Sequence, residues 1–398
     1  MTEVFLYDDA RARTFEPFAL TRPAGEMRAG AELVHERWRT ALGATEAFQL
    51  SAQHLLGFDE PQGASVISRP VPIGAWLVNA RFCPVLKQVN ANSDVLTAGG
   101  RVVAVRVRRP LPLADFLSGT FTLESVASSL SDHVEGWWMD EVWDYIGHLI
   151  PMLESDLPII GERLTTRAVK DAIRIGGHAI CVETGAVIEP SVVFDTSAGP
   201  IVIRKGAHVQ AFTRLVGPLY IGVDTVVTAD RIAASSIGDV CKVHGELSNS
   251  IFIGHANKGH DGFVGHSILG RWVNLGAGTI TSNLKNTYGT VALWTPSGVR
   301  DTKLQFLGTL FGDHAKTGIG LRLTTGTVLG AGSNVYGSAM PPKAVAPFSW
   351  GEAGAFSEYR FDKFLSVAER MMQRRHVPLS DSAKAQLAAS FAARWTAP

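Results

Sequence analysis

The segment Ile203-Arg-Lys-Gly-Ala-His-Val209-Gln-Ala-Phe-Thr-Arg-Leu215-Val-Gly-Pro-Leu-Tyr-Ile221-Gly-Val-Asp-Thr-Val-Val227 carries an aliphatic residue at every sixth position. The same beat returns at Ile237 and Val243, and again at Leu269 and Leu275. This period fits neither a helix, which repeats every ~3.6 residues, nor an alternating strand. Three strands of about six residues each can close one triangular coil with the aliphatic side chains pointing inward. The segment therefore predicts a left-handed parallel β-helix built of hexapeptide repeats.

The extent of this beat divides the chain into three expected segments. Residues 1–155 mix short apolar strands with helical spacing, which favours an α/β domain. Residues 156–346 form the β-helix, with loops expected to protrude at 228–236, 254–262 and 284–303, where the beat fails. Residues 347–398 form a helical tail with two amphipathic helices, Phe356–Gln373 and Ser380–Trp395, which we expect to cap the open end of the solenoid.

The composition narrows the partners and the compartment. Lys plus Arg and Asp plus Glu both total 37, so no net charge attracts nucleic acid or an anionic membrane. The three cysteines are odd in number and include no CxxC, which is typical of reduced thiols. The first residues lack the basic and apolar runs of a signal peptide, and no stretch approaches the ~20 apolar residues of a membrane span. We expect a cytoplasmic protein with no nucleic-acid partner and no membrane partner.

The densest polar run is Gly254-His-Ala-Asn-Lys-Gly-His-Asp-Gly-Phe-Val-Gly-His266, which is followed by Val273-Asn-Leu-Gly-Ala-Gly-Thr-Ile-Thr-Ser-Asn283. These stretches resemble the acetyltransferase domain of the GlmU family, whose motif runs KxGHxxYxG and then IGxxVNIGAGTITxN. GlmU-like enzymes are bifunctional UDP-N-acetylglucosamine diphosphorylases and glucosamine-1-phosphate N-acetyltransferases. The close match covers some thirty residues of the solenoid.

The resemblance implies a role for each matching residue. His260 matches the catalytic histidine, and an imidazole with a pKa near ~6.5 is suited to take the proton of an attacking amine. Lys258 belongs to the same motif and joins the catalytic set, as does Asn274, which matches an asparagine that contacts the sugar or the amine. Acetyl-CoA is the implied co-substrate, with Ala277 and Ala331 assigned to it. The residues assigned to the sugar phosphate are Arg231, Phe263, Asn283 and Lys285.

The chain also departs from the family pattern. Phe263 stands where the family has tyrosine, so one hydroxyl of the acceptor site is missing. One family lysine falls near Ser248-Asn249, which carry no cation, and Lys285 is only an approximate counterpart of the second. These departures leave the acyl group and the acceptor sugar open.

A zinc enzyme is the main alternative. His255 and His260 are five residues apart, and γ-class carbonic anhydrases, which are also left-handed β-helices, use a similarly spaced pair plus a third histidine from across the subunit seam. His178, His208, His244 or His266 would supply that third ligand, and catalytic zinc takes three histidines and a water. A second alternative is a non-catalytic scaffold that binds a sugar nucleotide with both sites degenerate.

The first segment opens with Leu6-Tyr-Asp-Asp-Ala-Arg-Ala-Arg13-Thr-Phe-Glu-Pro17-Phe-Ala-Leu-Thr-Arg22-Pro23. It resembles the opening of sugar nucleotidyltransferases, and in particular a divergent bacterial GlmU-like group, but the glycines that wrap the triphosphate are absent. The resemblance implies a Rossmann-like nucleotidyltransferase domain in which Arg13, Arg22 and Arg28 hold the phosphates and Asp8 or Asp9 helps to hold Mg²⁺. The competing interpretation is a degenerate domain that no longer transfers nucleotides.

Together these patterns predict an enzyme of sugar-nucleotide biosynthesis. The expected reaction is acetyl transfer from acetyl-CoA to the amine of an amino-sugar 1-phosphate, with a second activity, uridylyl transfer from UTP, in the first segment. A homotrimer is expected from the family and from geometry, because one flat β-helix flank cannot enclose a pantetheine arm without a neighbour.

Overall fold

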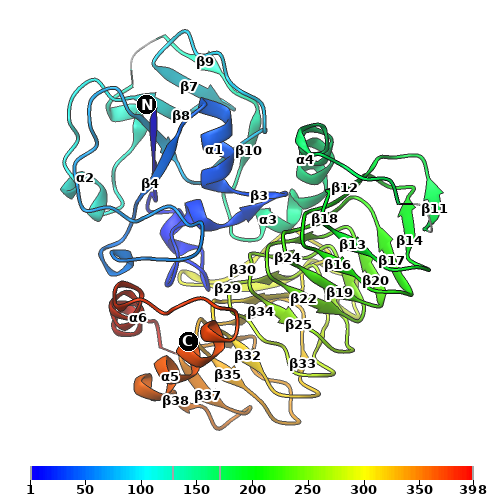
Figure 1. Ribbon diagram of the computed structural model, residues 1–398. Coiled ribbons are helices and arrows are strands. Elements are labelled where there is room, and N and C mark those ends of the chain that lie inside the picture. Colours follow the sequence, from blue (N-terminus) through cyan, green and yellow to red (C-terminus); the bar gives the residue numbers. More distant parts are fainter. Residues whose placement is uncertain (1, 128–129, 170–171, 397–398) are drawn as a thin grey trace. The chain divides into compact units, whose positions relative to one another are not determined.

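Figure 1 shows the computed structural model, which describes residues 2–127, 130–169 and 172–396. The chain divides into two compact units. The first comprises Met1–Asp144 and Met372–Arg394, and the second comprises Tyr145–Met371 and Trp395–Pro398. The segment limits that the sequence predicts, at residues 155 and 346, stay predictions. None of the helices in the described part of the chain has the length and the apolar character to cross a bilayer.

The first unit is built on a mixed six-stranded sheet. Its strand order is β4-β1-β5-β8-β7-β9, with β1 parallel to both β4 and β5 and with β8 antiparallel to β5 and β7. The bounds are β1 Glu3–Tyr7, β4 Glu46–Leu50, β5 Trp76–Asn79, β7 Val95–Ala98, β8 Arg101–Arg106 and β9 Asp132–His133. Strand β1 ends at Tyr7, so its carboxyl end leads directly into the loop that carries Asp8 and Asp9.

Short elements and helices surround this sheet. Helix α1 begins after Leu33 and ends at Gly43, whose left-handed φ of 58° closes the last turn. The other elements are β2 Arg28–Ala29, β3 Glu32–Leu33, β6 Phe82–Pro84, β10 Gly136–Trp138, α1 Val34–Leu42, α2 Ala114–Leu117 and α6 Asp381–Ala393, together with the 3₁₀ turns Ala12–Thr14, Ala24–Glu26, Gln53–Leu55 and Leu123–Ser125.

Helix α6 joins the first unit from the far end of the chain. Its buried Gln386 and Ser390 donate hydrogen bonds to the carbonyl oxygens of Thr21 (3.4 Å) and Leu20 (2.8 Å). Ser380 caps its first turn by accepting a hydrogen bond from the amide of Ala383. A single helix from the C-terminal segment thus completes the N-terminal unit.

The second unit is a parallel β-helix, as the sequence predicts, with three sheets along its flanks (Figure 1). The first sheet contains β11 Ile173–Gly176, β14 Val193–Thr196, β17 Thr213–Val216, β20 Asp230–Ala233, β23 Leu247–Ser248 and β26 Val264–Gly265. The second contains β12 Ile180–Val182, β15 Ile201–Ile203, β18 Leu219–Ile221, β21 Ser236–Ile237, β24 Ile251–Phe252, β27 Ile268–Leu269, β31 Thr309–Phe311, β34 Thr327–Leu329 and β36 Ala344–Val345.

The third flank begins with β13 Val187–Ile188, β16 His208–Val209, β19 Val226–Thr228, β22 Lys242–His244 and β25 Asn257–Lys258. Asn274 bridges from β25 to a second group, β32 Lys316–Thr317, β35 Asn334–Val335, β37 Ser349–Gly351 and β38 Ser357–Glu358. Helices α3 Asp144–Gly147 and α4 Leu149–Arg163 precede the solenoid, and α5 Phe361–Gln373 follows it. The pair β28 Ile280–Thr281 and β33 Arg322–Leu323 completes the coil walls.

The residues of the six-residue beat form the core of this β-helix. In the second sheet, Ile203, Ile221, Ile237 and Leu269 align in register from coil to coil with Phe252 between them, and none is accessible to solvent. The other predicted inward residues, Val209, Leu215, Val227, Val243 and Leu275, are buried as well. Burial of such columns removes about 25 cal/mol of unfavourable hydration per Å² of apolar surface, which holds each coil to the next. The predicted left-handed β-helix is confirmed.

Two of the three predicted loops are wrong. Asp230–Ala233 is a strand that continues the first sheet, with Ile232 buried between Leu215 and Leu247. Residues 254–262 contain strand β25, so the chain stays in the coil there too. Only residues 284–303 leave the solenoid, where β29 Ala292–Thr295 and β30 Gly298–Asp301 form an antiparallel hairpin.

The C-terminal helices do not act as one cap. β38 pairs antiparallel with β37, and in α5 the ring of Phe364 packs 4.9 Å from that of Phe348. Helix α5 up to Met371 therefore closes the solenoid end, whereas α6 belongs to the first unit.

Candidate active site

A buried lysine interrupts the aliphatic column of the third flank. Strand β25 aligns Lys258 with Val243 of the preceding coil, so the lysine occupies an inward position and is only 2% exposed. Its Nζ donates hydrogen bonds to the carbonyl oxygens of His244 (2.6 Å) and His260 (2.7 Å). Burial lowers the pKa of Lys258 to about 8, although the nearby carboxylates of Asp261 and Asp230 oppose this shift. The predicted loop would have placed Lys258 at the surface. The lysine instead lies inside the coil, where it donates hydrogen bonds to the backbones of two histidines.

A groove of about 910 Å³ lies along the edge of the solenoid where these strands end. Thr228 ends β19 and His244 ends β22 at aligned positions, and residues 259–261 follow β25 one coil later. Successive coils thus deliver their polar residues to one edge. The groove is lined by Gln210, Thr228, Ala229, His244, Gly259, His260, Asp261, Ala277, Gly278, Ile319 and Gly320.

His260 and Ala277 are the two predicted residues that line this groove. His260 is exposed, and within the described residues its imidazole has no hydrogen-bond partner. A ring without a partner keeps a nitrogen lone pair available to accept a proton. The placement of His260 suits the general base that the sequence predicts.

His244 is the second histidine of the groove. Its Nδ1 is hydrogen-bonded to the carbonyl oxygen of Thr228, and its Nε2 lies 2.8 Å from Oδ1 of Asp261 and 3.8 Å from Oδ2 of Asp230. The sequence points to His244 only as a third metal ligand, and it gives no signal for Asp230 or Asp261. These residues share one feature, which is that each lies at or just after the end of a strand on successive coils. The sequence alone does not show this, because it depends on how the strands pair.

The remaining acceptor-site candidates lie outside this lining. Asn274 accepts a hydrogen bond from Nδ2 of Asn257 (2.7 Å), an asparagine ladder between adjacent coils. Asn283 is hydrogen-bonded to His266 (2.9 Å), and burial lowers the pKa of that histidine to about 4. Lys285 donates to the carbonyl oxygen of Thr290 (3.0 Å) within its own loop.

Three further candidates take other positions. Arg231 is exposed on β20, and its guanidinium lies 3.7 Å from Glu246. Phe263 is half-buried before β26 and leaves no room for a side chain at Gly265. Ala331 is fully buried in the solenoid and is not among the residues that line the groove.

The two histidines of the zinc alternative differ in exposure, with His260 exposed and His255 buried. His255 is 8% exposed, and its ring packs 4.4 Å from that of Trp272. In the described ranges, the group whose possible ligand atoms converge, all within 4.8 Å of one another, is Asp230, His244 and Asp261. The zinc alternative takes its third histidine from across a subunit seam, so it stays a prediction.

In the first unit, internal partners engage the arginines assigned to nucleotide phosphates. Arg13 donates to the carbonyl oxygens of Leu117 (2.6 Å) and Phe116. Arg22 is 1% exposed and pairs with the Glu60 carboxylate at 3.0 Å, and Arg28 is buried and donates to the carbonyl oxygen of Ala31. Each guanidinium is thus already hydrogen-bonded or ion-paired to a group within the unit.

The two aspartates assigned to Mg²⁺ are engaged as well. Asp8 accepts hydrogen bonds from the Ser51 hydroxyl and from the amide of Ala24 (3.1 Å), and burial raises its pKa to about 6. Asp9 forms a bidentate ion pair with Arg81, at 2.9 and 2.7 Å. Burial alone would raise the pKa of Asp9, but the Arg81 contacts more than offset this and hold it below its ordinary value. These carboxylates do not fit a magnesium site.

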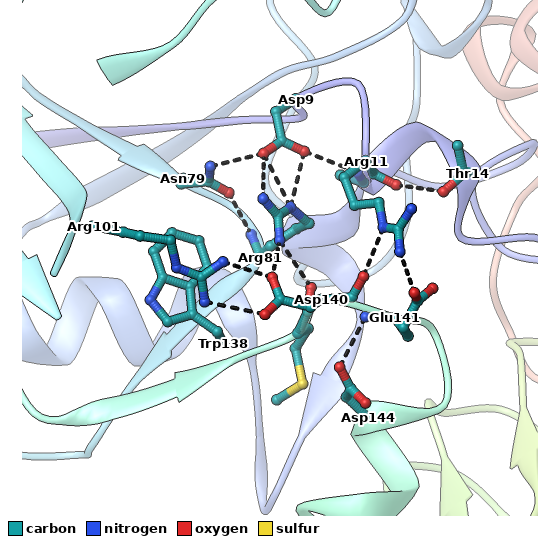
Figure 2. Close-up of polar contacts among 12 residues, drawn as sticks. Asp9, Arg11, Thr14, Asn79, Arg81, Arg101, Trp138, Asp140, Glu141 and Asp144 are labelled. Atoms are coloured by element: carbon teal, nitrogen blue, oxygen red, sulfur yellow. Dashed lines mark hydrogen bonds and ion pairs between the residues drawn. The ribbon is translucent and has the colours of Figure 1, made fainter. Parts of the chain in front are cut away.

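Figure 2 shows how the ion pair of Asp9 extends into a network at the end of β1 and β5. Arg81 also contacts Asp140 (2.8 Å), which in turn pairs with Arg101 (2.7 Å), whose guanidinium lies 3.7 Å from the ring centre of Trp138. Charged side chains therefore pair with one another beyond the carboxyl ends of β1 and β5.

Comparison with known proteins finds similarity to sugar nucleotidyltransferases and to bifunctional transferases of the GlmU type. A family model described as "Sugar nucleotidyl transferase" matches residues 4–164. The bifunctional protein GlmU of Methanococcus vannielii is 30% identical over 131 residues, which are 33% of this chain and 30% of that protein. A bifunctional sugar-1-phosphate nucleotidylyltransferase/acetyltransferase of Sulfurisphaera tokodaii is 26% identical over 287 residues, which are 70% of this chain and 62% of that protein.

The chain thus matches less than two thirds of the length of these relatives. Among solved structures, AntD, an N-acyltransferase from Bacillus cereus, is 11% identical over 55% of this chain and 95% of that chain, with a TM-score of 0.21. This score is too low to establish a shared fold.

Proposed function

We propose that this chain is an acyltransferase of sugar-nucleotide metabolism that works in the groove beside His260. The donor is acetyl-CoA, and the acceptor is the amine of an amino-sugar 1-phosphate. The observation that carries the proposal is the placement of His260 and Ala277, the motif residues assigned to base and cofactor, in one open groove. The bifunctional GlmU and nucleotidylyltransferase/acetyltransferase relatives support the same reaction class.

His260 takes the proton in this reaction. The amine nitrogen attacks the thioester carbonyl, the C–N bond forms as the C–S bond breaks, and the amine proton passes to the free imidazole nitrogen of His260. Lys258 is a positioning residue in this scheme, because its ammonium holds the backbone of His260 and does not reach the groove. In this scheme, the residues that line the groove orient the bound sugar.

The test is acetyl transfer by the purified chain to glucosamine 1-phosphate, followed through the release of free thiol. His260→Ala is expected to lower turnover by the order of 10²–10⁴-fold, because it removes the general base. His178→Ala is the matched control, since His178 is an exposed histidine of the same solenoid outside the groove lining. Unchanged turnover in His260→Ala would remove that residue from the role.

For the first unit we propose a domain that has lost nucleotidyl transfer. The observation that favours this is the engagement of Arg13, Arg22, Arg28, Asp8 and Asp9 by partners within the unit. A carboxylate paired with arginine at the phosphate position repels a triphosphate and competes for its cation partners.

Isothermal titration of the chain with UTP and Mg²⁺ checks this second proposal. We expect no saturable heat, in contrast with titration of acetyl-CoA into the same preparation. Saturable UTP binding that Arg13→Ala or Arg22→Ala abolishes would show that the unit binds nucleotides after all.

A further inference from the structure

Two exposed aromatic rings lie on the third flank beyond the groove. Tyr336 directly follows β35 and is 39% exposed, and Trp350 on β37 is 38% exposed. The two strands are neighbours in the solenoid (Figure 1), and the ring centres of the two residues lie 6.0 Å apart. Buried Tyr359 packs 4.7 Å from Trp350 and holds that ring in place. Exposed rings fixed in this way offer a surface on which a planar base can stack.

Tyr336 continues the line of the groove. Strands β32 and β35 pair in register, so Tyr336 occupies the place that Gly318 has one coil earlier. Gly318 directly precedes Ile319 and Gly320 of the groove lining, and a Cβ on Gly318 would lie 2.7 Å from the Cβ of Tyr336. The tyrosine therefore lies directly beside the end of the groove.

The distance from Tyr336 to the proposed base suits an extended donor. The bridges that link Asn257, Asn274 and Lys316, together with the pairing of β32 with β35, connect the coil of His260 to that of Tyr336. Three steps of about 4.8 Å place the ring about 14 Å farther along the solenoid. In acetyl-CoA an extended pantetheine arm separates the thioester from the adenine nucleotide, so a donor that reacts at His260 can bring its nucleotide to this end.

A guanidinium lies at the same end of the groove. Arg322 is exposed on β33, two residues after Gly320. Its Nη2 donates a hydrogen bond to the carbonyl oxygen of Ser338 (3.0 Å), which is two residues after Tyr336. In the described part of the chain no carboxylate is paired with Arg322, so its other donors remain available to a phosphate group.

An exposed carboxylate separates the two contacts. Glu352 lies against Gly337, since a Cβ on that glycine would fall 2.4 Å from Oε2 of Glu352. A carboxylate repels a phosphate but accepts hydrogen bonds from ribose hydroxyls and from the amino group of a base. This arrangement favours a nucleoside beside Tyr336 and a phosphate at Arg322.

We propose that Tyr336, Trp350 and Arg322 form a site for the nucleotide end of the acyl donor, in which the purine stacks on the aromatic rings and a phosphate binds the guanidinium. This inference rests on the proposed acyl transfer. No bond is made or broken at the site, so it sets the affinity for the donor and leaves the chemistry to His260. It selects an acyl-CoA over an acyl group on a carrier protein, whose pantetheine arm bears no purine.

The test removes the nucleotide from the donor. KM and kcat are measured with acetyl-CoA and with acetylpantetheine for wild type, Tyr336→Ala and Arg322→Gln. Each variant is expected to raise the KM for acetyl-CoA by about tenfold or more at an unchanged kcat, because stacking and phosphate contacts act on binding. The KM for acetylpantetheine should stay at the wild-type value. An equal rise with both donors would overturn the site.

Two variants elsewhere on the solenoid serve as controls. Tyr288→Ala removes an exposed tyrosine of the 284–303 excursion, and Arg174→Gln removes a guanidinium that also donates to one backbone carbonyl, that of Val169 (3.0 Å). Both should keep the wild-type KM for both donors. Sedimentation of Tyr336→Ala should match wild type. A dissociated assembly that is impaired with both donors would instead assign this face to a subunit interface and overturn the proposal.

Calorimetry gives a readout without turnover. CoA and its adenosine bisphosphate part alone are each titrated into the chain, and Tyr336→Ala is expected to weaken both by the order of tenfold. Equal affinity of the wild-type chain for CoA and for pantetheine would contradict the site. Binding of CoA by a wild-type chain that transfers no acetyl group would defeat the proposed acyl transfer and leave the nucleotide site standing.

Discussion

Lys258 is a cation at a position where the preceding coil has a valine. The coils on either side hold the lysine in the core, so its ammonium is bound by two carbonyl oxygens and is cut off from water. Desolvation of the charged form explains why its pKa falls to about 8. The motif alone cannot show this, because it does not say which face of the strand Lys258 takes.

This burial predicts a pH dependence of stability. The pKa of Lys258 is lowered from 10.5 in the unfolded chain to about 8 in the fold, so between these values the unfolded chain binds more protons. The free energy of unfolding should therefore rise as pH increases from about 8 to 10.5. Denaturation of wild type and Lys258→Met across this range checks it, and only wild type should show the added rise.

The control for this comparison is the outward lysine of the neighbouring strand. Lys242→Met is the comparison at a lysine that is exposed on β22, and it should keep the wild-type slope. A slope that is lost in both variants, or in neither, would contradict the assignment to Lys258.

At the scale of elements, the loop after β25 decides where His260 and Asp261 lie. Gly262 ends this loop with a φ of 123°, and a Cβ there would lie 2.3 Å from the carbonyl oxygen of Thr279 in the next coil. Neither the conformation nor the space admits a side chain, so the loop depends on this glycine.

Gly262→Ala is therefore expected to move the loop and to lower acetyl transfer by at least about tenfold, since small displacements of catalytic groups carry large costs. Gly177→Ala is the matched control, because no atom lies within 4 Å of its added Cβ. Turnover and thermal midpoint are measured for both variants. Wild-type turnover in Gly262→Ala would show that the loop tolerates the change.

The strands of the solenoid could be predicted where the six-residue spacing identifies their inward residues. The six-residue beat states directly which residues point inward, and all of those that it singled out are buried. The predictions of loops at 228–236 and 254–262 were wrong because they followed only the spacing of aliphatic residues. A strand with Lys258 at its inward position breaks that pattern without leaving the coil. The excursion at 284–303 was predicted as a protruding loop because the six-residue spacing fails there, and the structure shows it to contain an antiparallel hairpin.

The site was predictable only in part, for a related reason. His260 and Ala277 lie in motifs that are continuous in sequence, so the resemblance finds them. Thr228, His244 and Asp261 come from three successive coils, and only the strand register brings them to one edge. In the first unit, the sequence assigns Asp9 to Mg²⁺ and does not reveal its partner Arg81, because Arg81 and Asp140 are remote in sequence from Asp9.

At the scale of the whole molecule, the groove predicts assembly. It is open along its length, and Ile319, one of its lining residues, is 80% exposed, as is Phe212 on the same solenoid. A second β-helix would cover such residues and enclose a pantetheine arm.

We therefore expect a homotrimer in solution, measured by sedimentation equilibrium. Ile319→Asp should weaken the assembly and raise the KM for acetyl-CoA, because it charges a surface that a neighbour covers. Val299→Asp, at an exposed position of the hairpin, serves as control and should leave the sedimentation of the chain unchanged. A monomer at all concentrations would exclude the trimer.

Helix α6 has a consequence for the order in which this protein is made. The first unit's sheet is synthesised first and its last helix, residues 381–393, is synthesised last. In the folded unit this helix is hydrogen-bonded to Leu20 and Thr21. The segment around Leu20 and Thr21 therefore lacks its helix while the entire solenoid is translated and folds coil by coil. Until α6 is made, the first unit is incomplete and is open to the misassembly that partly folded domains undergo.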